Sequence, residues 1–553
     1  MTGLTSEPQN PMPFFVYTPL DDNRHRFRLL IISSGSSPDA IDCQLIQVPL
    51  GDEPSYEALS YTWGTPEFTS SISLNGTDFK VTPNLESALQ KLRLDIEDRI
   101  IWIDAICIDQ ANIPEKNQQV QQMRHIYQSA SRVVVWLGPE AEDSNIAMAA
   151  IERMGSSFNS ATMRLEDAHY VPNMDISDTA WQALGRLFRR SWYNRSWILQ
   201  EVSASENLIV MCGSQSVPWT MFYFAAAYIF YRAGREPGLS PLKDSGYESL
   251  FRLCYFLYIR TMSEESRRRE AGLLRLLTQS RHCDATDPRD KVYALLGIAS
   301  DMPNDADLKP DYAKPVAEVY QDLVKFIVTK DRNLDLLRAC QISRPEHDLP
   351  SWVPAWSIAG SVQGLNSFAS TFPGRASGNS VAVTRFPEDS STLVAQGVYV
   401  DIVMEIPNSS MSTSDSAQRN SLVERLTDNI INKVLDAVER NGPAVRAAMG
   451  IPTEGPPVPF SSMRHLSDSF SSNPRPVASF WTDTQLLGTT QASPIYGDIV
   501  CVFLGCSVPL ILRPQEDDVY RLVGEANIAA LMFGGVMTDV EEGRKTVREF
   551  HIV

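Results

Sequence analysis

Continuously apolar runs that alternate with amphipathic stretches restrict the fold of this chain more than any other feature. The runs at 99–103 and 132–138 lack the polar alternation of a half-exposed strand, so we expect strands buried on both faces of a sheet. Leucine and alanine recur at helical spacing across 82–93, and a second helical pattern covers 118–129. Strands that alternate with helices in this way predict an α/β domain with a parallel, doubly wound sheet.

Shorter strand signals extend this sheet on both sides. Residues 27–32 and 42–48 are expected to form an edge hairpin. Asn75-Gly76 separates two further strand-like runs, and this dipeptide supplies the positive φ angles of a type I′ turn. The apolar run 208–213 ends in glycine and is expected to join the same sheet.

The chain of 553 residues exceeds what one hydrophobic core usually supports, so we expect several packing units. We assign residues 1–49 to an N-terminal strand-rich extension and residues 50–220 to the α/β domain. Residues 221–450 are expected to form a mainly α-helical region, which includes a helix over Val316–Lys330. Residues 451–553 are expected to hold a loop insertion and a small β-rich unit at the C-terminus.

The formal net charge of −18 argues against nucleic acid or an anionic membrane surface as a partner, because both attract basic proteins. The eight cysteines form no CxxC pair, and the histidines never pair at metal-ligand spacing, so we expect no metal site. The N-terminus lacks the pattern of a signal peptide, and no apolar run approaches the roughly 20 residues that span a bilayer. We therefore expect a soluble, cytoplasmic protein without a membrane span.

Four long motifs occur in order along the α/β region. They are Tyr-Glu-Ala-Leu-Ser-Tyr-Thr-Trp-Gly at 56–64, Thr-Pro-Asn-Leu at 82–85, Trp-Ile-Asp-Ala-Ile-Cys-Ile-Asp-Gln at 102–110 and Arg-Val-Val-Val-Trp-Leu-Gly at 132–138. Together they resemble the successive motifs of the fungal heterokaryon-incompatibility (HET) family. Later segments also resemble full-length members, at 197–201, 287–297, 310–312, 351–354, 497–499, 512–514 and 523–525, so the resemblance spans most of the chain.

Two positions depart from the family pattern. The family commonly has asparagine where this chain has Asp109, and its usual Glu-Arg pair is here Glu115-Lys116. Neither change removes a catalytic residue type, but an amide at position 109 cannot be assumed to be required.

The resemblance implies a role in nonself recognition, in which HET-domain activity triggers growth arrest or cell death after incompatible cells fuse. It implies other incompatibility proteins, or further copies of the same chain, as partners. HET domains are also distantly similar to Toll/interleukin-receptor (TIR) domains, so residues 50–220 are expected to form a TIR- or flavodoxin-like parallel sheet. Some TIR domains cleave NAD with one glutamate, which makes NAD(P) the candidate substrate, with no cofactor bound tightly; this rests on analogy of fold.

Glu201 is the candidate catalytic residue. TIR NAD-cleaving domains resemble one another around a Trp-Cys-x-x-Glu pattern, and Trp197-Ile-Leu-Gln-Glu201 keeps the tryptophan and the glutamate. One carboxylate suffices in principle, because nicotinamide is already a cationic leaving group and needs no general acid. The alternative is structural, with Glu201 capping a helix or pairing with Arg195 or Arg189.

Three further residues are candidates for binding the substrate. Asp104 and Asp109 follow a predicted parallel strand, and ligands bind beyond the carboxyl ends of such strands. The alternatives are that Asp104 caps the next turn and that Asp109 begins an Asx turn. Gly64 ends another strand, where a glycine lets the backbone approach a ligand or simply makes a turn.

Two functions of different classes therefore remain open. The first is NAD(P) hydrolysis at Glu201, and the second is a protein-interaction module that self-assembles or recruits partners without an active site. A pocket at the strand ends that holds Glu201 and Asp104 favours the enzyme. Burial of Glu201 in a salt bridge favours the interaction module.

Overall fold

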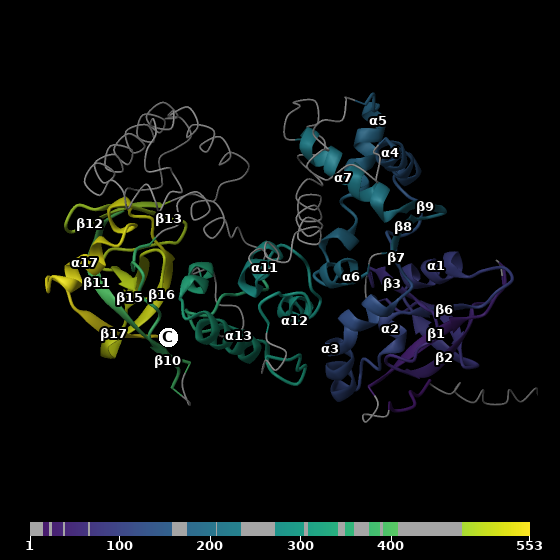
Figure 1. Ribbon diagram of the computed structural model, residues 1–553, viewed down its shortest axis with the longest axis horizontal. Coiled ribbons are helices and arrows are strands. Elements are labelled where there is room, and N and C mark those ends of the chain that lie inside the picture. The colour runs from purple at the N-terminus through teal and green to yellow at the C-terminus, as the bar shows by residue number, and fades with distance from the viewer. Residues whose placement is uncertain are drawn as a thin grey trace, which may run out of the picture. The chain divides into compact units, whose positions relative to one another are not determined.

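The computed structural model describes twelve stretches of the chain, which divide into two compact units, residues 1–314 and residues 315–553 (Figure 1). The stretches are 15–20, 25–36, 39–64, 67–157, 174–205, 207–233, 271–302, 308–340, 349–358, 375–387, 391–406 and 478–553. Residues 234–270 and 407–450 of the expected helical region, and the whole loop insertion at 451–476, lie outside the described residues.

The first unit is built on a nine-stranded mixed sheet with the order β5-β4-β2-β1-β6-β3-β7-β8-β9 (Figure 1). The strands are β1 (Arg26–Ile32), β2 (Asp42–Pro49), β3 (Glu57–Tyr61), β4 (Ser70–Leu74), β5 (Thr77–Val81), β6 (Arg99–Trp102), β7 (Arg132–Trp136), β8 (Leu208–Cys212) and β9 (Gln215–Pro218). The expectation of a parallel sheet holds for the four central strands, and β2 and β4 also pair in parallel. Antiparallel pairing of β1 with both β2 and β6, of β4 with β5 and of β8 with β9 makes the whole sheet mixed.

The central strands β6, β3, β7 and β8 run parallel to one another. β3 comes first in the chain but lies second in this row, so the chain moves outward from β3 in both directions. The carboxyl ends of β3 and β7 therefore form a topological switch point, which is where open α/β sheets bind ligands. The strand over 208–213 joins the sheet as expected, because β8 pairs with β7 in parallel.

Local sequence explains several of the elements. Asn75 and Gly76 have φ angles of 50° and 76°, which confirms the predicted type I′ turn between β4 and β5. The predicted hairpin of β1 and β2 also forms, but β1 lies inside the sheet because its other side pairs with β6. An edge hairpin was therefore the wrong expectation for β1.

The described stretches of the first unit also form helices. They are α1 (Pro83–Leu92), α2 (Asp104–Cys107), α3 (Ile113–Ser129), α4 (Ser144–Ser156), α5 (Asp178–Leu187), α6 (Ile198–Ala204), α7 (Trp219–Ala233), α11 (Leu273–Gln279) and α12 (Asp290–Leu296). Thr82 caps α1 as its sequence predicts. α3 begins five residues earlier than expected because Asn112 caps it and Pro114 fits its first turn. α6 packs on β3, α3 and α12, so three elements hold it beside the strand ends.

The second unit begins with α13 (Val316–Asp331), which confirms the predicted helix, and continues into an eight-stranded sheet. Its strands are β10 (Thr384–Arg385), β11 (Leu393–Glu405), β12 (Ala478–Thr482), β13 (Leu487–Thr490), β14 (Ile499–Phe503), β15 (Leu510–Pro514), β16 (Val519–Glu525) and β17 (Val547–Ile552). β11 pairs with both β14 and β17, which closes β11, β14, β15, β16 and β17 into a ring. Closure satisfies the backbone groups that an open sheet edge would expose.

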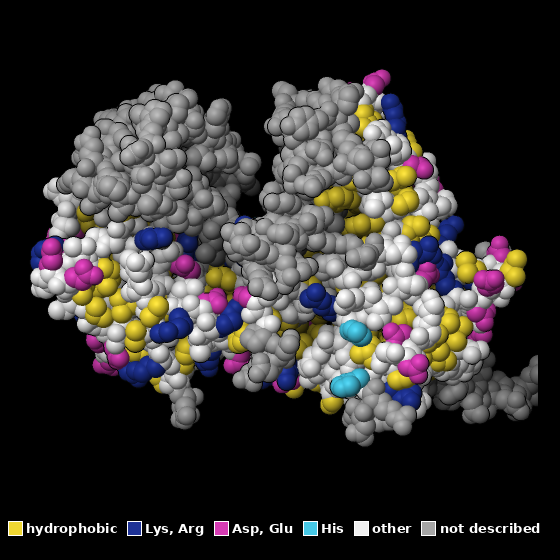
Figure 2. All heavy atoms as spheres, viewed as in Figure 1, with side chains coloured by type: hydrophobic (Ala, Val, Ile, Leu, Met, Phe, Trp, Pro, Cys, Tyr) yellow, Lys and Arg dark blue, Asp and Glu magenta, His cyan; other side chains and the backbone are white. Residues whose placement is uncertain are grey.

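The described surface mixes charges of both signs. Figure 2 shows Lys and Arg side chains interspersed with Asp and Glu on the visible face, so the acidic excess does not gather there into one patch. Within the stretches that the structure describes, no helix combines the length and the apolar character needed to cross a membrane.

Candidate functional site

Five polar side chains meet at the carboxyl end of β3 and form what we call the strand-end cluster. Ser60 comes from β3, Asp104 from the start of α2, Glu201 from α6, and Trp192 and Arg195 from the segment before α6. Asp104 and Glu201 are 9% and 1% exposed, respectively. Two buried carboxylates around one guanidinium are the chemical core of this cluster.

Glu201 is held by two side chains. The Ser60 hydroxyl donates to Glu201 Oε2, and Arg195 Nη1 donates to the same oxygen at 3.3 Å. Trp192 Nε1 in turn donates to Ser60 Oγ at 2.9 Å, which fixes the direction of the hydroxyl. The predicted alternative of a pair with Arg195 is therefore confirmed, and Glu201 lies in a buried salt bridge.

Burial dominates the electrostatics of Glu201. Desolvation raises the pKa of its carboxyl, Arg195 and the Ser60 hydrogen bond lower it, Asp104 raises it further, and the net direction is upward. Burial also raises the pKa of Asp104 against the opposing charge of Arg195. Burial works to lower the pKa of Arg195, but the two carboxylates hold it above its ordinary value. The single guanidinium thus compensates two carboxylates only in part.

Asp104 reaches the cluster from the end of β6. Its Oδ2 accepts from Trp63 Nε1 at 3.0 Å, and its Oδ1 accepts from the backbone N–H of Ala105 at 2.7 Å. The alternative that Asp104 caps the next turn is wrong, because Asp104 is the first residue of α2, whose N-cap is Ile103 and which has no side-chain cap bond. The structure therefore brings Asp104 and Glu201 together around Arg195, as the sequence analysis proposed for the strand ends.

A second layer of contacts fixes the ends of β3 and β7. Asn84 of α1 donates to the carbonyl of Thr62 at 2.6 Å and accepts from Trp136 Nε1 at 3.1 Å. Arg190 Nη1 donates to the carbonyl of Leu137 at 2.8 Å. These bonds join the two strands at the switch point, so the backbone beneath the cluster is held from both sides.

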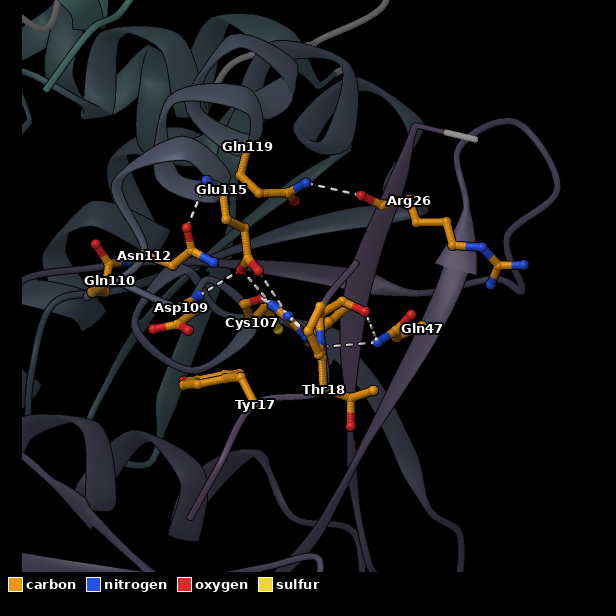
Figure 3. Close-up of polar contacts among 12 residues, drawn as sticks. Tyr17, Thr18, Arg26, Gln47, Cys107, Asp109, Gln110, Asn112, Glu115 and Gln119 are labelled. Atoms are coloured by element: carbon orange, nitrogen blue, oxygen red, sulfur yellow. Dashed lines mark hydrogen bonds and ion pairs between the residues drawn. The ribbon is translucent and has the colours of Figure 1, made fainter. Parts of the chain in front are cut away.

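Asp109 lies outside the strand-end cluster. Its backbone N–H donates to Glu115 Oε1 at 2.8 Å, and its Oδ1 accepts from the N–H of Ala111 at 3.2 Å, which is the predicted Asx turn. Figure 3 shows its carboxylate pointing away from Glu115, on the side of Tyr17. It lines a separate pocket beside the hairpin of β4 and β5.

Glu115 anchors the loop that carries Asp109 (Figure 3). Both of its carboxylate oxygens accept from Arg28, at 2.5 and 2.9 Å, and both side chains are almost fully buried. Arg28 also donates to the carbonyls of Cys107 and Thr18. This bidentate pair therefore joins β1, α3 and the N-terminal segment into one rigid support.

Gly64 adopts a φ of +80°, in the region that favours glycine, with the nearest atom to an added Cβ being Asn84 Cβ at 3.9 Å. Residues 65 and 66 lie outside the described stretches, so the turn expected here stays a prediction. Gly64 is exposed, and it touches neither the carboxylates of the cluster nor the pocket of Asp109.

Trp197 and Glu201 are linked through the backbone but bind different partners. The N–H of Glu201 donates to the carbonyl of Trp197 at 3.1 Å. The side chain of Trp197 hydrogen-bonds the carboxyl of Asp290, which also accepts from Tyr312 at 2.5 Å. Burial raises the pKa of Asp290 to about 6. The segments around 290 and 312 thus secure the start of the helix that carries Glu201.

Sequence reasoning found the carboxylates but not all of their partners. Ser60 and Trp63 lie inside the motif at 56–64, yet no pattern marked either as a site residue. Trp192 lies nine residues before Glu201, so no helical spacing connects the two. Among the described residues, no group of three or more His, Cys, Asp and Glu side chains is arranged to hold a metal ion.

Comparison with known proteins adds to this geometry. The family described as heterokaryon incompatibility protein (HET) matches residues 56–201, and the Het-6 β-barrel domain matches residues 472–553. The chain is 31% identical over 405 residues to "Heterokaryon incompatibility protein 6, OR allele" of Neurospora crassa, a match that covers 61% of this chain and 58% of that protein. No solved structure matches the chain significantly. The first match runs from the start of β3 to Glu201, so it contains the whole strand-end cluster.

Proposed function

This chain is a HET-domain protein, and we propose that it acts in fungal nonself recognition, with its first unit arresting growth or killing cells after incompatible fusion. The relative from Neurospora crassa, which carries the name of an incompatibility protein, supports this role. The chain spans 58% of the length of that relative, so the role of the whole relative is carried over here as a proposal.

The geometry of Glu201 best supports action as a protein-interaction module. Its side chain is 1% exposed, and its Oε2 is occupied by both Ser60 and Arg195. A substrate that must meet this carboxylate has no direct access to it in this arrangement. This burial is the observation that carries the proposal, with other incompatibility proteins or further copies of the chain as the partners.

α3 offers a surface with which to test the module. Gln121, His125 and Gln128 are exposed and lie at helical spacing, so they form one polar stripe, which we call the α3 stripe. α3 also packs against α6. A partner bound to the α3 stripe would therefore contact the helix that packs on α6, the element that carries Glu201.

The test is induced expression in a filamentous fungus, scored as growth and cell viability. We expect the wild-type chain to arrest growth, and we expect replacement of all three residues of the α3 stripe by alanine to abolish the arrest. Glu152→Gln, on the exposed face of α4, is the matched control and should leave the arrest unchanged. Absence of arrest by the wild-type chain at confirmed expression would contradict the proposed role, and arrest by the stripe variant would contradict the proposed surface.

A second candidate is NAD(P) hydrolysis, favoured by the order of the parallel strands. The row β6, β3, β7 and β8 has the order 2-1-3-4, which is that of flavodoxin-like sheets, and the strand-end cluster lies at its switch point. Buried carboxylates with perturbed pKa values at such a place are typical of functional sites. This supports the TIR- or flavodoxin-like architecture and a catalytic role for Glu201 as proposals.

In this second candidate the bond between nicotinamide and ribose breaks, and nicotinamide leaves with the bonding electrons as a neutral molecule. Water adds to the ribose carbon and loses a proton, while the Glu201 carboxylate stabilises the positive charge that develops on the sugar. The reaction requires Glu201 to separate from Arg195, for example on assembly. Purified protein forced to oligomerise should then release nicotinamide from NAD. Release that is undiminished in Glu201→Gln would contradict this role for Glu201.

A further inference from the structure

A pocket of about 280 Å³ lies beside the strand-end cluster, between the end of β3, the hairpin of β4 and β5, and the loop after α2. Aromatic rings dominate its lining, with contributions from Tyr17, Tyr61, Trp63, Phe68 and Phe79. The volume is close to the lower limit of about 300 Å³ for drug-sized ligands, so the pocket suits a single ring system rather than an extended chain.

The aromatic residues come from three separate parts of the first unit. Tyr17 belongs to the N-terminal segment, where its hydroxyl donates to the carbonyl of Ile106 at 2.9 Å. Phe15 packs against both Tyr17 and Phe79, with ring centroids 5.0 and 5.5 Å apart. These contacts fix the rings of Tyr17 and Phe79 without any ligand, so this part of the lining is preorganised.

Charge at this pocket favours a cation. Asp109 lines it, and within the part of the chain that the structure describes only one of its carboxylate oxygens has a hydrogen-bond partner, the N–H of Ala111. Lys80 also lines the pocket, but its side chain is 58% exposed and paired with Asp78 at 3.0 Å. One carboxylate oxygen is therefore available to a ligand, while the nearby lysine charge is already compensated.

Trp63 connects the pocket with the strand-end cluster. Its ring lines the pocket, and its Nε1 donates to Asp104. Tyr61 lines the same pocket and interacts electrostatically with Asp104, Arg195 and Glu201. The two rings thus separate a ligand in the pocket from the buried carboxylates, and binding there does not require Glu201 to be exposed.

We propose that this pocket binds a planar cationic ring of the N-alkylpyridinium class, such as the oxidised nicotinamide ring of NAD(P). Aromatic faces attract cations and also stack on planar rings, while the free oxygen of Asp109 provides the opposite charge. The inference goes beyond the proposed role in nonself recognition, because it holds whether or not the ligand is hydrolysed.

The test measures binding of 1-methylnicotinamide to the full chain by calorimetry or by saturation-transfer NMR. This probe carries the cationic ring but no ribose, so it cannot be hydrolysed at a ribosyl bond. Neutral nicotinamide and the non-planar cation choline are the comparison ligands. We expect 1-methylnicotinamide to bind at least about fivefold more tightly than either of them. Equal or weaker binding of 1-methylnicotinamide would overturn the proposal.

Two variants assign the binding to this pocket. Phe68→Leu removes a ring that is 55% exposed, so the fold should survive, and it should weaken 1-methylnicotinamide binding about threefold. Asp109→Asn keeps an acceptor for the N–H of Ala111 but removes the charge. It should weaken the binding of 1-methylnicotinamide about fivefold while leaving the binding of neutral nicotinamide unchanged. Ile96→Ala, at an 89% exposed residue outside the pocket, is the control and should have no effect.

Unaltered binding in both pocket variants would contradict the assignment. The binding result can also be distinguished from success or failure of the proposed NAD(P) hydrolysis. Binding of 1-methylnicotinamide without nicotinamide release from NAD supports the pocket and counts against the enzyme. Release from NAD without binding of the probe counts against the pocket alone.

Discussion

Two buried Arg–Glu pairs in the first unit differ in how completely they are partnered. In the pair of Arg28 and Glu115, both carboxylate oxygens are bonded to the guanidinium, and three backbone groups add further hydrogen bonds to the pair. In the pair of Arg195 and Glu201, the guanidinium donates one hydrogen bond, from Nη1 to Oε2 at 3.3 Å. Asp104 interacts electrostatically with the same guanidinium.

This difference separates a structural ion pair from a candidate site. A bidentate pair with satisfied neighbours offsets much of the cost of burying two charges. Burial raises the pKa of Glu201, and its charge at the strand ends is compensated only in part. Carboxylates with such unfavourable electrostatics are typical of functional sites. The sequence alone gives no sign of this difference, because both pairs consist of one arginine and one glutamate and residue type does not reveal how completely each pair is partnered.

The largest expected effect comes from breaking the well-partnered pair. Glu115→Ala leaves the buried Arg28 without its counter-charge, so we expect the free energy of unfolding to fall by about 3–5 kcal/mol. Urea denaturation followed by tryptophan fluorescence measures this loss. Glu152→Ala, at an exposed position of α4, is the control and should change stability by less than about 0.5 kcal/mol. A loss below about 1 kcal/mol for Glu115→Ala would show that this pair is not a structural support.

The strand-end pair should respond differently to two replacements. Glu201→Ala leaves the Ser60 hydroxyl without its acceptor and opens a cavity, so we expect a loss of about 2–4 kcal/mol. Glu201→Gln keeps an acceptor for Ser60 and leaves Arg195 facing Asp104, so we expect a loss of about 1 kcal/mol or less. The same denaturation measurement decides between them. A loss of about 2 kcal/mol or more for Glu201→Gln would refute the view that the charge of Glu201 adds little to stability.

A pH titration of stability extends the comparison to Asp290. Its folded-state pKa of about 6 lies above the ordinary value of 3.8, so the folded chain binds this proton more tightly. The resulting stabilisation is full below about pH 4 and is lost as pH rises through about 6, with a magnitude of at most about 3 kcal/mol. Asp290→Asn removes the ionisation, so the difference in unfolding free energy between wild type and variant should change over this range. Parallel curves for the two proteins would contradict the assignment.

The smallest effect is expected at Gly64, which follows the end of β3. Gly64→Ala meets no atom closer than 3.9 Å but must adopt a φ of +80°, so we expect a loss of about 1 kcal/mol. Gly535→Ala is the control, because Gly535 lies in α17 (Gly535–Glu541) without a positive φ, and it should be neutral or slightly stabilising. A loss well above about 2 kcal/mol at Gly64 would indicate contacts beyond the strain of the positive φ.

Local patterns predicted much of the fold. The turn at Asn75-Gly76, the capped helix after Thr82 and the buried strands β6 and β7 follow from spacing and residue type over short windows. The position of β1 between β2 and β6 did not follow, because strand pairing depends on contacts between residues about 70 apart. For the same reason the closed ring of strands in the second unit was not foreseen.

The candidate site was predictable in part. Asp104 and Glu201 were found because strand ends and helix starts are visible in sequence, and Arg195 was named as an alternative partner. Ser60 and Trp192 join the cluster only when β3 and α6 come together across 141 residues of chain. The pocket of Asp109 depends in addition on the N-terminal segment, whose Tyr17 lies 89 residues from the carbonyl to which it donates.

The central claim is that the first unit triggers growth arrest as an interaction module whose Glu201 is a buried, ion-paired residue. Induced expression of Glu201→Gln in a filamentous fungus, at a level matched to wild type, tests this claim most directly. The account predicts growth arrest as complete as that of the wild-type chain. Normal growth of cells that contain folded Glu201→Gln protein would contradict it and would favour NAD(P) hydrolysis.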